Sequence, residues 1–105
     1  MSLAELYTIL IGTNLPVVYR AWPEGKAPPL PWICYHTPGE NPFGADGVVY
    51  YAGIRVNVEL YTAKKDPATE AVVDAALTAA GIFYEKSEEY SDSEKCYQIL
   101  YEIEV

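Results

Sequence analysis

The stretch Ile54-Arg55-Val56-Asn57-Val58-Glu59-Leu60-Tyr61 decides the fold of this 105-residue chain. Large apolar residues occupy every second position, a period typical of a β-strand with one buried and one outward face. We place this strand within residues 48–62. The core face is expected to hold Ile54, Val56, Val58 and Leu60. The opposite face, which meets water or a partner, is expected to hold Arg55, Asn57, Glu59 and Tyr61.

Two further strands are predicted before this one, at residues 17–22 and 32–37, because both runs are rich in β-branched and aromatic residues. Residues 23–31 hold four of the eight prolines and are expected to be an irregular connection. Residues 38–47 are rich in glycine and proline, so we expect a loop.

Helices are predicted at two places. Ser2 and Glu5 form a capping-box pattern, and the apolar residues Leu3, Leu6, Tyr7 and Leu10 then follow at helical spacing up to Gly12. Asp66-Pro67 is an N-cap pattern that opens a second helix ending near Gly81. Its expected buried stripe is Val72, Val73, Ala76, Leu77 and Ala80.

Strands at residues 82–90 and 95–105, joined by the turn 91–94, complete the chain. The order of helix, three strands, helix and two strands predicts one α+β domain over residues 1–105. We expect a mainly antiparallel sheet of about five strands with two helices packed on one face.

The composition restricts the possible partners. Fifteen acidic and seven basic residues give a net charge of −8, which argues against nucleic-acid binding, because phosphate contacts depend on clustered Lys and Arg. No apolar run is long enough to span a bilayer and the N-terminus lacks a secretory n-region, so we expect no membrane association.

The candidate reactive groups do not form a known motif. Cys34 and His36 share a strand face, but a strand histidine beside a packed thiol is favoured over a catalytic dyad. Neither Cys34 nor Cys96 has zinc-binding spacing, and we expect buried, reduced thiols rather than a bridge. We therefore predict no catalytic residue, cofactor or metal.

Acidic and aromatic residues gather in the last two strands. The carboxylates Glu85, Glu88, Glu89, Asp92 and Glu94 lack calcium-loop spacing, so a solvated sheet edge is favoured. The chain has ten tyrosines and only two phenylalanines. Tyrosine is suited both to cross-strand pairs and to protein interfaces, and the sequence leaves both roles open.

Three sequence motifs, spread over nearly the whole chain, are similar to those of a known protein family. They are Pro28-Pro29-Leu30-Pro31-Trp32-Ile33-Cys34-Tyr35, then Val56-Asn57-Val58-Glu59-Leu60-Tyr61-Thr62-Ala63-Lys64-Lys65-Asp66-Pro67, and Gly81-Ile82-Phe83-Tyr84-Glu85-Lys86-Ser87-Glu88. In their order, the chain resembles the tail-terminator or tail-completion proteins of long-tailed bacteriophages and prophages, the lambda U-like family.

The resemblance implies a non-enzymatic protein of the virion tail, assembled in the bacterial host cytoplasm. It implies a homo-oligomeric, hexameric ring at the head-proximal end of the tail tube, which ends tube polymerisation and contacts the major tail tube protein and the head–tail connector protein. The alternative is a small acidic α+β ligand-binding or regulatory domain of a cytosolic protein.

The expected interface residues come from the exposed strand face and the loop rather than from a family motif. They are Arg55, Asn57, Glu59, Tyr61 and Phe43. We expect the loop 38–47, which holds Phe43, to be mobile in the free subunit and ordered in the ring.

Overall fold

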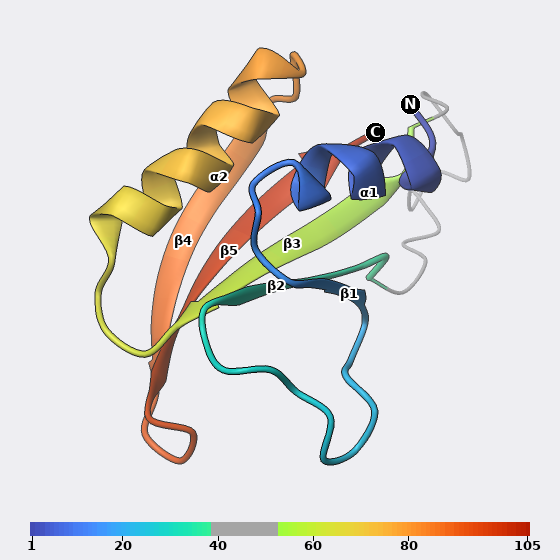
Figure 1. Cartoon of the computed structure of the whole chain (residues 1–105). Helices are drawn as coiled ribbons and strands as arrows, with labels where there is room; N and C mark the ends of the chain where they lie inside the picture. The colour runs from blue at the N-terminus through green and yellow to red at the C-terminus, as the bar shows by residue number, and fades with distance from the viewer. Residues whose placement is uncertain (39–52) are drawn as a thin grey trace, which may run out of the picture.

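The computed structural model describes residues 1–38 and 53–105, which form one mixed sheet with two helices on one of its faces (Figure 1). The elements in chain order are α1 (Leu3–Ile11), β1 (Val17–Tyr19), β2 (Trp32–His36), β3 (Arg55–Thr62), α2 (Pro67–Ala79), β4 (Tyr84–Ser91) and β5 (Cys96–Glu104). None of the described helices is long and apolar enough to cross a membrane.

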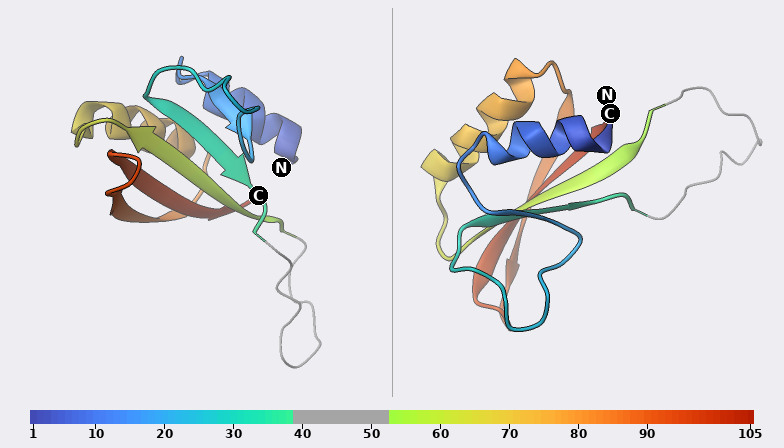
Figure 2. Two further views of the ribbon diagram at one scale, coloured as in Figure 1. Left: turned by 90° about the horizontal axis from the view of Figure 1, so that it is seen from below. Right: turned by 45° about the vertical axis from the view of Figure 1, so that its right-hand side comes forward.

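The sheet has five strands in the order β1-β2-β3-β5-β4. Strand β1 runs parallel to β2, and the other three neighbouring pairs are antiparallel. Both helices lie on the same side of the sheet in each view (Figure 2). The predicted α+β class is confirmed, and the parallel β1–β2 pair at one edge is the feature that the sequence patterns did not indicate.

Both helices begin where the sequence predicts. The Ser2 Oγ accepts a hydrogen bond from the Glu5 backbone N–H at 3.1 Å, and Glu5 Oε1 accepts one from the Ser2 N–H at 2.7 Å. Asp66 caps α2 by accepting from the Thr69 N–H at 3.1 Å, with Pro67 at the first helical position. Gly81 follows α2 with φ of 75°, a left-handed conformation that glycine adopts at little cost and that turns the chain toward β4.

The core lies between the helices and the sheet. It consists of Leu6, Leu10, Ile33, Tyr35, Val56, Val58, Leu60, Val73, Leu77, Ile82, Ile99, Tyr101 and Ile103. Two expected members are wrong. Ile54 is 39% exposed because it precedes β3 at the end of the sheet, while Val72 lies on the outer side of α2 and is 45% exposed.

One carboxylate belongs to the buried stripe of α2. Glu70 is only 5% exposed, and its Oε2 and Oε1 lie 2.6 Å from Lys65 Nζ and 3.1 Å from Lys86 Nζ. Lys65 precedes the helix and Lys86 comes from β4, so the pairing ties three segments together. A buried charge is tolerated only when it is paired in this way.

Candidate functional site

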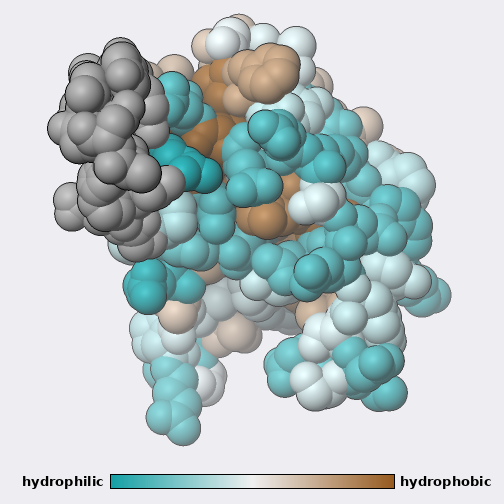
Figure 3. Space-filling model, turned by 180° about the vertical axis from the view of Figure 1, so that it is seen from behind, coloured by the Kyte–Doolittle hydropathy of each residue, from teal (hydrophilic) through white to brown (hydrophobic). Residues whose placement is uncertain are grey.

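The sheet face that points away from the helices is the candidate site. Residues opposite each other on antiparallel strands share a face, so the strand registers identify its members. They are Trp32, Cys34, His36, Arg55, Asn57, Glu59, Tyr61, Glu85, Ser87, Glu89, Ser91, Cys96, Gln98, Leu100, Glu102 and Glu104. We call this set the open face, because no helix of residues 1–38 and 53–105 covers it. Seen from behind, the molecule presents a mostly hydrophilic surface with small apolar areas (Figure 3).

The four predicted interface residues of β3 all lie on the open face, but they are not equally accessible. Arg55 is exposed, whereas Asn57, Glu59 and Tyr61 are half-buried. Phe43, with the loop 38–47 apart from Pro38, lies outside the described residues. Arg55 is therefore the member of the predicted set best placed to meet a partner.

Tyr61 belongs to an aromatic cluster on this face. Its ring lies 4.8 Å from that of Trp32, which in turn lies 5.7 Å from that of Trp22. The Tyr61 hydroxyl donates a hydrogen bond of 2.8 Å to Glu59 Oε1. Burial and this bond raise the pKa of Tyr61 well above its ordinary value. Tyr61 thus contributes to packing as well as to the surface.

The segment after β1 forms a pocket of about 330 Å³ over this cluster. Trp22 and Trp32 line it, together with Arg20, Cys34 and Glu59. The indole N–H of Trp22 is buried and has no acceptor among residues 1–38 and 53–105. A buried donor without a partner costs free energy, so the Trp22 N–H is an unfavourable feature of the pocket wall.

Cys34, His36 and Glu59 meet beside this pocket. Their donor atoms all lie within 4.8 Å of one another, and His36 Nδ1 is 3.8 Å from Glu59 Oε2. The sequence patterns missed this group, because Glu59 comes from β3 and reaches Cys34 only through the β2–β3 register. Cys34 and Cys96 are both buried and unbridged, as predicted.

The Cys34 thiol is poorly suited to nucleophilic catalysis. Burial, with the negative charge of Glu59, raises its pKa to about 11. The thiol instead donates a hydrogen bond of 2.9 Å to the Arg20 carbonyl. Because the thiolate is the nucleophile, a thiol that stays protonated at neutral pH supports the packed-thiol interpretation over a catalytic dyad.

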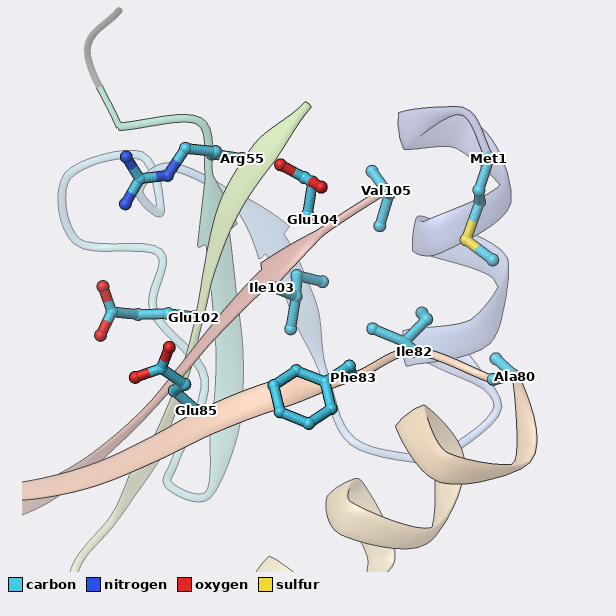
Figure 4. Close-up of a pocket in the computed structure, with 11 residues that line it drawn as sticks. Met1, Arg55, Ala80, Ile82, Phe83, Glu85, Glu102, Ile103, Glu104 and Val105 are labelled. Carbon is cyan, nitrogen blue, oxygen red and sulfur yellow. The ribbon is translucent and has the colours of Figure 1, made fainter. Parts of the chain in front are cut away.

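At the other end of the open face, the carboxylates of Glu85, Glu102 and Glu104 and the guanidinium of Arg55 line a pocket of about 600 Å³ (Figure 4). Glu85 and Glu102 lie directly opposite each other on β4 and β5, and their carboxylates point to the same side. Phe83 stands beside them with 85% of its surface exposed. Like charges directly opposite on neighbouring strands repel, so this pair lowers the stability of the isolated chain.

The solvated acidic edge predicted for β4 is confirmed, since Glu85, Glu88, Glu89, Asp92 and Glu94 are all exposed. The proximity of Glu102 to Glu85 was not predicted, because it depends on the strand register. Glu88 differs from the rest in facing α2, where it pairs with Lys65 at 2.5 Å.

The tyrosines divide between cross-strand packing and exposed surface. The ring of Tyr84 packs on Tyr101 at 5.2 Å and that of Tyr90 on Tyr97 at 4.9 Å, as stabilising cross-strand neighbours. At the opposite sheet edge, Tyr19 is 44% exposed and its ring lies 5.1 Å from that of Tyr35. Together with Tyr7, Tyr19 leaves aromatic surface open beside β1.

Comparisons of the chain with protein-family models, curated proteins and solved structures found no match.

Proposed function

We propose that the chain is a non-enzymatic structural protein of a long-tailed bacteriophage or prophage. It forms a hexameric ring at the head-proximal end of the tail tube, ends tube polymerisation and joins tail to head. The resemblance of its three sequence motifs to tail-terminator proteins suggests this role. The observation that carries it is the open face, where charged and aromatic side chains of four strands lie side by side and no described helix covers them.

Ring closure by identical subunits requires two different surfaces on each subunit, because the contact is head-to-tail. The two edges of the sheet differ in this way. The β1 edge carries the aromatic surface of Tyr7 and Tyr19, whereas the β4 edge carries carboxylates and ends near the exposed Phe83. Two unlike edges on opposite sides of one sheet are suited to successive contacts around a ring.

The charge of the chain supports the same role. Repulsion between Glu85 and Glu102 is relieved when a partner brings a basic side chain to that pocket, so the acidic end favours a basic patch on the tube or connector protein. A net charge of −8 also keeps DNA phosphates from adhering to the ring as DNA passes through it.

Sedimentation velocity of the chain, alone and with purified tail tubes, tests the proposal. We expect concentration-dependent association and co-sedimentation with tubes. Arg55→Glu and Phe83→Ser should weaken both, because the two side chains are exposed on the proposed contact surfaces. Lys64→Glu is the matched charge-reversal control, since Lys64 is exposed outside the open face. A chain that stays monomeric and never co-sediments with tubes contradicts the proposal.

A ligand-binding or regulatory domain is the second candidate, favoured by the 330 Å³ pocket on the open face. The chain has two tryptophans and both line this pocket. Saturable quenching of tryptophan fluorescence by a small molecule, in a chain that does not bind tubes, would support this candidate instead.

A further inference from the structure

The Cys34, His36 and Glu59 group has the composition of a transition-metal site. A thiol, an imidazole and a carboxylate, the three side-chain types that bind zinc in proteins, converge with their donor atoms within 4.8 Å. Bond lengths of about 2.0–2.3 Å in a tetrahedron place zinc ligands roughly 3.5 Å apart. The donors therefore need to approach by about 1.3 Å at most, which side-chain rotation can supply.

The surroundings orient the group. The Tyr61 hydroxyl donates a hydrogen bond of 2.8 Å to Glu59 Oε1. The other carboxylate oxygen, Glu59 Oε2, lies 3.8 Å from His36 Nδ1. Hydrogen bonds of this kind to a ligating carboxylate are typical of metal sites, where they fix the ligand in place. Cys34 and Glu59 also line the 330 Å³ pocket, which gives an ion and one water access to them.

The charges balance for a divalent ion. When the metal binds, the Cys34 thiol proton, now donated to the Arg20 carbonyl, is released to solvent, and the sulfur becomes a thiolate ligand. A thiolate, a carboxylate and a neutral imidazole then neutralise a charge of +2. A thiolate and an imidazole also select zinc over calcium and magnesium, which prefer oxygen ligands.

We propose that Cys34, His36 and Glu59 bind one Zn²⁺ ion per chain, with Tyr61 as a positioning residue and a water in the fourth position. The site is a property of the isolated subunit and does not depend on ring formation.

Titration of the untagged, reduced full chain with Co²⁺, followed by displacement with Zn²⁺, tests this. We expect one Co²⁺ per chain, with a thiolate-to-cobalt charge-transfer band and the intense visible bands of tetrahedral cobalt. His36 is the only histidine in the chain, so its imidazole NMR signals report directly on binding and should shift with saturating Zn²⁺. Cobalt spectra without the thiolate band overturn the proposal.

Variants separate the site from adventitious binding. Cys34→Ser, His36→Gln and Glu59→Gln should each weaken Zn²⁺ binding at least 100-fold, whereas Tyr61→Phe should weaken it about 10-fold. Cys96→Ser is the matched control, because it removes the other buried thiol and leaves all three ligands in place. Equal affinity in the Cys34→Ser and Cys96→Ser chains rules the site out. If Cys34→Ser fails to fold, the proposal is tested by the thiolate-to-cobalt band of the wild type and by the Zn²⁺ affinity of His36→Gln.

Discussion

The hydroxyl of Tyr101 donates a hydrogen bond of 2.7 Å to Asp74 Oδ1 and so joins β5 to α2. Tyr101 is fully buried, and burial together with this bond raises the pKa of its hydroxyl well above the ordinary value. Lys86 from β4 reaches the same carboxylate, with its Nζ 3.1 Å from Asp74 Oδ2. The contact between helix and sheet therefore combines apolar packing with a small polar network.

Tyr101→Phe tests this network. The change keeps the ring and removes the hydroxyl, so we expect a loss of about 1.5–3 kcal/mol in the free energy of unfolding, the range for a hydrogen bond to a charged group. Urea denaturation measures it. Tyr90→Phe is the control, because Tyr90 is 48% exposed and should change stability by less than about 0.5 kcal/mol. Equal stability of Tyr101→Phe and wild type would contradict the prediction.

Glu70 should make the chain sensitive to acid. Burial alone would raise its pKa, but hydrogen bonds from Lys65 and Lys86 and their positive charges outweigh burial and lower it. A carboxyl whose pKa is lower in the folded state stabilises the fold at pH values above its unfolded pKa, and this contribution disappears as the pH falls through the folded pKa.

We therefore expect the wild type to lose stability more steeply than Glu70→Gln as the pH falls from about 6 to about 3. At pH 7, Glu70→Gln should be less stable, because it leaves two lysines without their shared partner. Denaturation curves across this pH range provide the measurement. Parallel pH profiles for the two chains would show that Glu70 makes no such contribution.

Removing the repulsion between Glu85 and Glu102 should stabilise the isolated chain. Either Glu85→Gln or Glu102→Gln is expected to raise the free energy of unfolding by about 0.2–1 kcal/mol, since each change abolishes the same like-charge pair. The double variant should gain less than the sum of the single gains. The gain should also shrink at high salt, which screens exposed charges. If Glu85 and Glu102 serve a partner, these variants should bind tail tubes more weakly despite their higher stability.

Substitutions at Arg55 and Tyr61 should differ in their effect on stability, because Tyr61 is packed against another side chain and Arg55 is exposed. On the sequence pattern alone, which places both residues on the exposed face of β3, Arg55→Glu and Tyr61→Ser are each predicted to cost less than about 0.5 kcal/mol. Because Tyr61 packs on Trp32, we expect a small cost only for Arg55→Glu, about 0.2–1 kcal/mol, since it replaces an opposite-charge pair with Glu104 by a like-charge pair. Tyr61→Ser should cost about 2 kcal/mol or more, because it removes a half-buried ring and its bond to Glu59.

Thermal unfolding of the Arg55→Glu and Tyr61→Ser chains measures these two losses of stability. A large loss of stability in Arg55→Glu would place that residue in the packed structure and remove it from the proposed interface.

Local patterns in the sequence determined the elements of this fold. The alternation through Val56, Val58 and Leu60 specifies a strand with one buried face, and the caps at Ser2 and Asp66 specify where the helices begin. Each of these signals acts within about four residues along the chain, so it can be recognised without knowing what lies across the sheet. The α+β class follows from the order of such elements.

The tertiary structure decided which side chains meet. Glu85 faces Glu102, and Glu59 reaches Cys34 and His36, only because particular strand registers align them. A register shift of one residue would turn every side chain of a strand to the opposite face, so alternation restricts the register, but which residues stand opposite each other also depends on which strands pair. Burial of Glu70 likewise depends on Lys86 arriving from β4. The elements are encoded by neighbours in sequence, whereas the candidate sites arise from pairings between segments that are distant along the chain.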